Sequence, residues 1–276
     1  MRRRRKVKGL FSILFLGTGA ADWPGEYDAS LEAAEKGTVR GMASILVNGK
    51  VLVDCGPTVW DAMRLFGADP RQVSDLLITH THGDHLNGEA LEQLIGARVG
   101  EEPLRVWVEE SGLERVPVLE GLVVESLEVG QQFEIGGVSV LALAANHVVK
   151  SPEQPLHFLF QREGRTVLYA TDGAWLLKET WLRLRETKLD AILWDATNGD
   201  SQGDWRIFEH NSVDMIRIML QTLRKEELLA PGAQVLLTHM ARTLCAPHEE
   251  MRASLEPEGL VPAHDGMVIE LGVVDE

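Results

Sequence analysis

The sequence predicts an α+β fold in which two β-sheets pack face to face and helices cover the outside. Strand-like runs alternate with helical patterns along the whole chain, in two comparable halves. The 276 residues are 45% hydrophobic, which is ample for a core, and no linker or repeat divides them. No apolar run reaches the roughly 18 residues that span a bilayer, so a membrane is not an expected partner.

The first half of the chain contains four strand-like runs and two helical patterns. Asn48-Gly49 lies between two apolar runs and is the strongest short signal for a β-hairpin. Apolar residues from Leu86 to Leu94 recur with the spacing of one helix face. The elements expected here are strands at 11–17, 41–47, 50–54 and 76–79, a helix at 58–66 and a second helix that starts at residue 86.

The second half contains mostly strands, with two helical patterns between them. Apolar residues from Val213 to Leu223 recur at helical spacing, and Asn211 or Ser212 can cap the start of that helix. The elements expected here are strands at 104–108, 122–127, 138–143, 156–161, 166–170, 191–194, 235–237 and 267–271, and helices near 175–185 and 213–223.

The chain is acidic overall but begins with a basic segment. Its formal net charge is −15, while residues 1–8 hold six basic residues and no acidic one. An acidic surface repels polyanions, which disfavours long RNA or DNA as a partner. The basic segment and the apolar run after it are typical either of a signal peptide or of a disordered tail before a first strand. Cys55 and Cys245 are too few for a disulfide framework, which favours a reducing, cytoplasmic compartment.

The most informative stretch runs from Thr79 to His85. It places the imidazoles of His80, His82 and His85 and the carboxylate of Asp84 within six residues. These groups are ligands of divalent metals such as Zn²⁺, Mn²⁺ and Fe²⁺. Because a buried strand precedes the stretch, we expect it at a strand end, where α/β sheets place their active sites.

Single potential ligands follow three later strands. His147, Asp172 and His239 each come directly after a strand-like run, and any one of them alone would be an ordinary turn residue. Together with the stretch above they make five histidines and two aspartates at successive strand ends. That set suffices for two metal ions that share one carboxylate.

The order of these residues resembles the metallo-β-lactamase superfamily. The similarity extends to Gly17-Thr18-Gly19, Val53-Asp54-Cys55-Gly56, Thr171-Asp172 and Thr238-His239. It implies an αββα sandwich of two mixed sheets whose first strand is residues 11–17. That strand argues against a signal peptide, so we expect a basic, disordered tail over 1–8 and a single domain over 9–276.

The resemblance also implies a binuclear metal centre. In it His80, His82 and His147 would hold one metal, Asp84, His85 and His239 would hold the other, and Asp172 would bridge them. Neither cysteine takes a ligand position. The cofactors expected are therefore two divalent ions, zinc or manganese, with iron as a further option. Asp54 is expected to orient a ligand histidine, or else to cap the end of its strand.

His210 favours a phosphodiester over a carbonyl compound as the substrate. It stands before the helical pattern at 213–223, and a similarly placed histidine occurs in phosphodiesterases and ribonuclease Z of the superfamily. An imidazolium can protonate a leaving alkoxide or bind phosphoryl oxygens. The resemblance is strongest to the phosphoribosyl cyclic phosphate phosphodiesterase branch, through Asn146-His147, the Asp195 segment and residues 264–269.

We therefore expect a binuclear hydrolase that cleaves a small or cyclic phosphodiester by attack of a metal-bridging hydroxide on phosphorus. His210, Asp84 and Asp172 are the expected catalytic residues. A lactonase or thioesterase would use the same centre without His210. A ribonuclease Z-like enzyme is disfavoured by the acidic surface and the lack of a long substrate-gripping arm. A non-catalytic binding domain is disfavoured because all seven ligand positions are filled, and a homodimer is left open.

Other candidates lie near the expected site. Trp205 and Arg206 fall between Asp195 and His210, where the indole could line the substrate pocket and the guanidinium could pair with a phosphate. His264 could line the same cleft. Trp23, Trp175 and Trp194 could also line the substrate pocket, but core packing is the role expected for them. Structural roles are expected for His157 and His248.

The segment after the first strand differs from the resembled branch. That branch holds a structural zinc with cysteines after the Gly-Thr-Gly turn, whereas residues 22–41 contain no cysteine here. Arg242 stands where a further zinc-binding histidine would be expected. The sequence therefore predicts no structural zinc.

Overall fold

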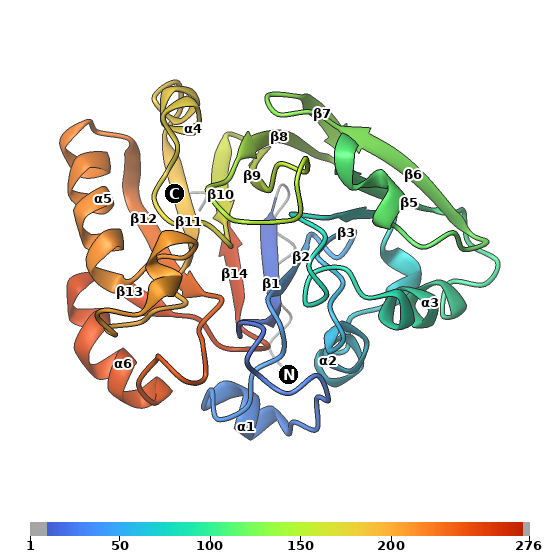
Figure 1. Cartoon of the computed structure of the whole chain (residues 1–276), viewed down its shortest axis with the longest axis horizontal. Helices are drawn as coiled ribbons and strands as arrows, with labels where there is room; N and C mark the ends of the chain where they lie inside the picture. Colours follow the sequence, from blue (N-terminus) through green and yellow to red (C-terminus); the bar gives the residue numbers. More distant parts are fainter. Residues whose placement is uncertain (1–9, 273–276) are drawn as a thin grey trace.

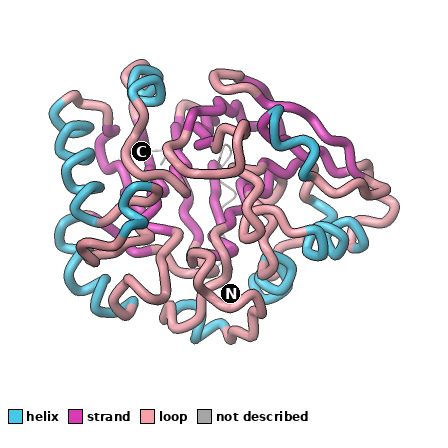
Figure 2. Tube along the Cα trace, viewed as in Figure 1, coloured by secondary structure: helices cyan, strands magenta, loops and turns pink. Residues whose placement is uncertain are grey.

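Two mixed β-sheets of seven strands each form the centre of the molecule. The computed structural model describes residues 10–272, so the basic tail predicted for residues 1–8 lies outside the described residues. In Figure 1, α5 and α6 lie along one side of the strands and α2 and α3 along the opposite side. Figure 2 shows the same arrangement, with helices at the periphery and strands inside. The predicted α+β sandwich is confirmed.

The first sheet has the order β14-β1-β2-β3-β4-β5-β6. From β14 to β3 neighbouring strands are antiparallel, and from β3 to β6 they are parallel. Its strands are β1 (Phe11–Gly17), β2 (Ser44–Val47), β3 (Val51–Val53), β4 (Asp75–Leu77), β5 (Leu104–Glu109), β6 (Leu122–Leu127) and β14 (Val268–Leu271).

The second sheet repeats this plan in the order β13-β12-β11-β10-β9-β8-β7. From β7 to β10 neighbours are antiparallel, and from β10 to β13 they are parallel. Its strands are β7 (Gln132–Ile135), β8 (Val138–Ala144), β9 (Leu156–Arg162), β10 (Arg165–Ala170), β11 (Leu189–Asp195), β12 (Leu229–Thr238) and β13 (Leu260–Pro262).

Six α-helices and four 3₁₀ turns are found among residues 10–272. The α-helices are α1 (Leu31–Glu35), α2 (Val59–Phe66), α3 (Gly88–Gly96), α4 (Lys178–Leu184), α5 (Val213–Lys225) and α6 (His248–Leu255). The 3₁₀ turns are η1 (Pro70–Gln72), η2 (Glu110–Arg115), η3 (Trp205–Phe208) and η4 (Glu256–Glu258). Ser212 caps α5 by accepting a hydrogen bond from the backbone of Met215, as the sequence suggested.

Three layers of apolar side chains hold these elements together. Between the sheets, Phe11 and Phe15 of β1 belong to one buried cluster with Phe158, Phe160 and Tyr169 of the second sheet. A second cluster joins the outer face of the second sheet to α5 and α6, and a third joins the first sheet to α2 and α3. Burying one such side chain fully contributes about 1.5–3 kcal/mol, so the apolar faces read from the sequence determine the layering.

Most predicted elements form, and the hairpin shows why. Asn48 and Gly49 both have positive φ, at 51° and 69°, as a tight turn between two twisted strands requires. Four elements lie outside the expected ranges: β7, β13, α1 and α6. The first three have three to five residues each, which is too short for a periodic apolar pattern to stand out, and α6 has eight.

The tryptophans do not all lie where the sequence suggested. Trp194 is fully buried in β11, as expected. Trp175 is 42% exposed, so the expectation of core packing is wrong for this residue, which lies on a loop rather than a strand. Trp23 is half-buried and lines a cavity. None of the described helices is both long and apolar enough to cross a membrane.

Candidate metal centre

The strand directions bring the predicted ligands to one edge of the sandwich. Parallel β3 and β4 end together, which places Asp54 and His80 side by side. Strands β10, β11 and β12 are parallel and end at Asp172, Asp195 and His239. Strand β8 points the same way as β10, because β9 is antiparallel to both. His147 therefore joins the same edge, where α/β sheets place their ligands.

The backbone is strained where three of these strands end. Asp54, Asp172 and His239 have φ values of 63°, 52° and 54°, in the left-handed region that favours glycine. Such conformations cost about 1–3 kcal/mol each and cluster at functional sites, because the surrounding structure must enforce them. Here they turn Asp172 and His239 into the cavity over the candidate ligands and turn Asp54 against His85.

The first group of candidate ligands consists of His80, His82 and His147. Nε2 of His80 lies 2.9 Å from Nδ1 of His82, and Nε2 of His147 lies 3.3 Å from the same nitrogen. The three ring nitrogens lie within 4.8 Å of one another, as ligands of one ion would. Burial lowers the pKa of His147 to about 4 and that of His80 well below its ordinary value, so both rings are neutral.

The second group consists of Asp84, His85 and His239, with Asp172 between the groups. Nε2 of His85 lies 3.2 Å from both an Asp84 oxygen and an Asp172 oxygen. Nε2 of His239 lies 3.2 Å from the other oxygen of Asp172. His147 is 3.9 Å from that same oxygen, so the Asp172 carboxylate touches both groups.

The charge of the second group suits a cation. Burial opposes protonation of His85, but Asp172, Asp84 and Asp54 together raise its pKa well above the ordinary value. Burial favours protonation of Asp172, yet the surrounding histidines hold its pKa well below the usual range. A divalent ion placed among these carboxylates would neutralise the same negative charge that His85 now faces.

Unsatisfied ring nitrogens test whether metal ions fit here. Nε2 of His85 and Nε2 of His239 are buried and have no hydrogen-bond partner in the described structure. Such atoms are costly unless something binds them. Their Nδ1 atoms are engaged on the far side of each ring, so the Nε2 lone pairs point into the site. The donor set and its open atoms therefore fit two divalent cations.

Two threonines and Asp54 orient the rings. Nδ1 of His85 donates to Asp54, 2.9 Å away, and Thr79 donates its backbone N–H to the same carboxylate. The hydroxyl of Thr197 donates to the carbonyl of His239 and accepts from that ring's Nδ1, 2.7 Å away. The sequence indicates the role of Asp54 but not those of Thr79 and Thr197. Thr79 directly precedes the His80 ligand, which was a usable signal, whereas Thr197 had none.

His210 lies in the same site and is buried rather than exposed on a helix start. Its Nδ1 lies 2.7 Å from Asp195 and 3.9 Å from Asp172. Asp195 also accepts backbone hydrogen bonds from Thr197 and Asn211, which fixes the carboxylate. Burial disfavours the imidazolium, but Asp195 more than reverses this and raises the pKa of His210 to about 9. The ring is therefore positively charged at neutral pH.

A cavity of about 200 Å³ opens over these residues. Residues 20–22 form one wall, and Arg206 and Glu209 form another beside His210. The guanidinium of Arg206 makes two hydrogen bonds to Asp204. Trp205 is 64% exposed, and Nδ1 of His264 donates to the backbone carbonyl of Asp265. Neither residue belongs to this lining.

Gly56 lets the ligand loop approach the first sheet. A Cβ at this position would collide with the backbone carbonyl of Asp84. The neighbouring Cys55 donates its N–H to the carbonyl of His85, 2.7 Å away. Only glycine permits this close approach, which fixes the height of Asp84 and His85 above the strand ends.

Comparison with protein families decides the membership of the chain. Residues 50–240 match the model of a family described as the beta-lactamase superfamily domain, and this range includes all seven candidate ligands. The chain belongs to this family. The predicted resemblance to the metallo-β-lactamase superfamily is thereby confirmed, as is the fold class.

Members of the superfamily with solved structures share the fold along their whole length. A diphosphatase from the PhnP family superposes with a TM-score of 0.71 at 20% identity, over 95% of this chain and 97% of that chain. The metallo-beta-lactamase fold protein YhfI from Bacillus subtilis gives 0.71 at 18% identity, over 96% and 100%. The short form of human tRNase Z gives 0.67 at 18% identity, over 95% and 100%.

Curated relatives match over a shorter segment. Ribonuclease Z of Methanothermobacter thermautotrophicus is 31% identical over 100 residues, which are 36% of this chain and 29% of that protein. Ribonuclease Z of Geobacillus kaustophilus is 37% identical over 98 residues, which are 34% of this chain and 29% of that protein. The match thus spans less than a third of the length of these relatives.

Proposed function

We propose that this chain is a binuclear metal-dependent phosphodiesterase that acts on a small or cyclic phosphodiester. The observation that carries the proposal is the position of His210. Its charged imidazole lines the cavity beside the seven candidate ligands, and Asp195 engages its Nδ1. This leaves Nε2 as the ring atom that can serve a substrate.

The proposed ligands divide as the geometry groups them. His80, His82 and His147 would hold one ion, Asp84, His85 and His239 would hold the second, and the Asp172 carboxylate, which touches both groups, would be shared. Zinc and manganese both suit these nitrogen and oxygen donors. When bound, two such cations supply a water nucleophile of lowered pKa and polarise the phosphoryl oxygens.

The chain's own residues then complete the reaction. His210, protonated below about pH 9, donates a proton from Nε2 to the oxygen of the leaving alcohol as the P–O bond breaks. Until then its charge attracts the phosphoryl oxygens. Asp195 keeps the ring in one orientation, and Asp172 fixes the distance between the two ligand groups.

The size of the cavity supports a small scissile group. Its volume of about 200 Å³ is below the 300–1,000 Å³ typical of ligand pockets, so it accepts a phosphate and little more. An RNA phosphodiesterase is the second candidate, because several relatives are ribonuclease Z enzymes. The net charge of −15 disfavours it, since long nucleic acids require a positive surface.

The test compares the wild type with His210→Ala on four substrates: bis(p-nitrophenyl) phosphate, a 2′,3′-cyclic phosphate, a lactone and a β-lactam. We expect turnover of the phosphodiesters only. At unchanged metal content His210→Ala should lose about 10²–10⁴-fold in kcat on the cyclic phosphate, whose leaving alkoxide needs a proton, and less on bis(p-nitrophenyl) phosphate, whose p-nitrophenolate leaves as a stable anion. Unchanged turnover of the cyclic phosphate in His210→Ala, or turnover of the lactone instead, contradicts the proposal.

A further inference from the structure

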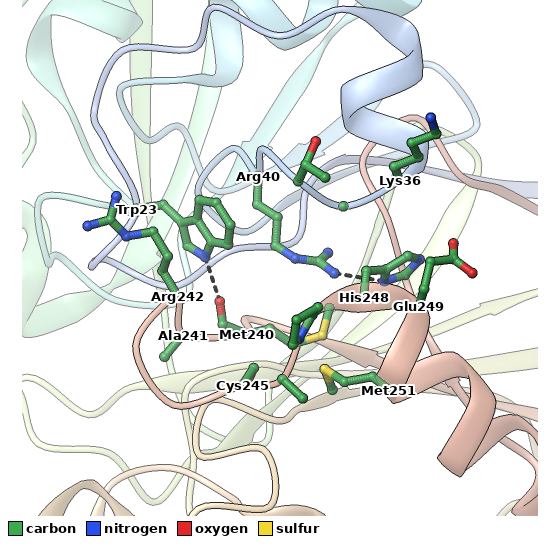
Figure 3. A pocket seen from close by; sticks show the side chains of 14 residues that line it. Trp23, Lys36, Arg40, Met240, Ala241, Arg242, Cys245, His248, Glu249 and Met251 are labelled. Carbon is green, nitrogen blue, oxygen red and sulfur yellow. Dashed lines mark hydrogen bonds between the residues drawn. The ribbon is translucent and has the colours of Figure 1, made fainter.

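A second cavity lies beside the metal centre, behind a thin wall of backbone. Its volume is about 480 Å³, more than twice that of the cavity over the ligands, and Figure 3 shows the side chains that line it. Residues 20–23 and 239–242 make the wall. Ala20, Ala21 and Asp22 face the metal centre, whereas Trp23 and Met240 face the second cavity.

Hydrogen bonds make this wall rigid. Ala20 donates its N–H to the carbonyl of Met240 at 3.1 Å, and Nε1 of Trp23 donates to the same carbonyl at 2.8 Å. Asp22 accepts from the backbone N–H groups of Arg242 and Thr243, at 2.8 and 3.0 Å. The Trp23 indole is therefore held in place before any ligand arrives, which lowers the cost of binding.

The lining combines an aromatic face with positive charge. Trp23, Met240 and Met251 provide apolar surface, as Figure 3 shows for the indole and the two sulfur atoms. On the opposite side Arg40 donates to Nδ1 of His248 at 2.9 Å. Burial, together with the charge of Arg40, lowers the pKa of His248 to about 4, so the ring is neutral and accepts this bond.

Cationic side chains line the cavity although the chain is acidic. Lys36, Arg40 and Arg242 lie in the lining together with Glu249. Lys36 pairs with Glu32 at 2.6 Å and Arg40 lies in the field of the buried Asp265, which leaves Arg242 as the cation most open to an anionic ligand. A flat ring attached to an anionic group matches this combination, because the ring stacks on an indole and the anion meets the cations.

Two arginines connect this cavity to the metal centre. Arg206 lines the metal-centre cavity and Arg242 lines the second cavity, and both lie near Asp22 in the wall. Burial raises the pKa of Asp22, but hydrogen bonds from Thr243 and Arg242 and the charge of Arg206 lower it overall. An anionic substrate that crosses the top of the wall would meet both guanidinium groups.

We propose that the second cavity is the specificity subsite of the metal centre, and that it binds the non-leaving group of the phosphodiester as a flat ring of nucleobase size. The proposal rests on the proposed phosphodiesterase function and names its substrate class. The metal-centre cavity is too small for such a ring, whereas about 480 Å³ is ample. Trp23 supplies the stacking face.

The experiment uses two substrates that release the same p-nitrophenolate. Methyl p-nitrophenyl phosphate needs only the metal centre, while thymidine 5′-(p-nitrophenyl phosphate) also offers a ring to the subsite. We expect kcat/KM of the wild type to be higher for the thymidine ester. Trp23→Ala should reduce this preference by about tenfold or more, the size of one lost base–indole stack, and should reduce turnover of the methyl ester by a smaller factor, because the indole also supports the wall.

Two further variants separate stacking from a structural role. Trp23→Phe loses the bond to Met240 but keeps an aromatic face, so it should retain most of the preference. Trp175→Ala, which removes an exposed indole outside both cavities, is the matched control and should not change it.

The outcomes distinguish the subsite from the proposed function. Methyl ester turnover without any preference for the thymidine ester overturns the subsite and leaves the phosphodiesterase standing. An equal loss on both esters in Trp23→Ala also overturns the subsite, since the indole then only supports the wall. If neither ester is hydrolysed, the proposed function fails and the subsite fails with it.

Discussion

The two halves of the candidate metal centre are built in different ways. One half is a single loop after β4, which supplies His80, His82, Asp84 and His85 within six residues. The other half takes His147, Asp172 and His239 from the ends of three strands of the second sheet. A few hydrogen bonds to Asp54 and Glu153 hold the loop, whereas the register of a whole sheet positions the strand ends.

The two halves of the centre are therefore held in place by different contacts. The loop is fixed by a few contacts, such as the bonds from Thr79 to Asp54 and from the backbone of Thr81 to Glu153. The strand ends depend on parallel pairing over β10, β11 and β12 and on strained backbone at Asp172 and His239. A substitution at the residue that touches both halves should therefore reduce activity most. A substitution that removes one orienting contact should have a smaller effect on the site.

The largest effect is expected at Asp172, the residue that joins the halves. Asp172→Ala removes the carboxylate that touches His85, His239 and His147. We expect kcat/KM to fall by about 10⁴-fold or more, because several kcal/mol of transition-state stabilisation depend on the paired cations. Elemental analysis should show a loss of bound metal. A variant that keeps its full metal content and activity would show that the halves do not share this carboxylate.

His210→Ala should have the next largest effect on activity, and it should change the pH profile. Asp195 raises the pKa of His210, which predicts that wild-type kcat declines at alkaline pH as the imidazolium loses its proton. The variant should be slower by about 10³-fold and lack this basic limb, with its metal content intact. A basic limb that persists in His210→Ala assigns the titration to another group.

Orienting contacts in the two halves should matter about equally. Asp54→Asn replaces the charged acceptor of His85 with a neutral amide, and Thr197→Val removes the acceptor for His239. Each should weaken metal affinity by about 10–100-fold in competition with a chelator. Thr238→Val is the matched control, since the buried hydroxyl of Thr238 has no hydrogen-bond partner in the described structure. A loss at Thr238 as large as at Thr197 would indicate a packing effect instead.

The smallest expected effect is on the free energy of unfolding, through the ion pair of His210 and Asp195. The pKa of His210 is raised from 6.5 to about 9 in the fold by its pairing with Asp195. The pair should therefore stabilise the fold fully below about pH 6.5 and lose this contribution as the pH rises through about 9. The difference in unfolding free energy between wild type and His210→Gln should be about 1–3 kcal/mol at pH 6 and shrink by pH 10. A difference independent of pH would exclude this ion pair as the cause.

The same contrast explains what the sequence could predict. The loop half was visible directly, because its ligand types and spacing are local, and the hairpin at Asn48 followed from turn chemistry in the same way. Only the family resemblance identified His147, Asp172 and His239 as candidate ligands, because their proximity depends on the order of the strands. Thr197 could not be predicted, because its contact with His239 spans 42 residues and a threonine at a strand end is common. The second cavity behind Trp23 depends on a wall between residues about 220 apart, which no local pattern reveals.

The most direct test of the account is a crystal structure of the purified chain with anomalous scattering measured at the edges of zinc and manganese. We predict two peaks about 3.5–4 Å apart, one among His80, His82 and His147 and one among Asp84, His85 and His239, with Asp172 between them. A single peak, or peaks that leave the strand-end half of the ligands uncoordinated, would contradict the claim that the two halves form one binuclear centre.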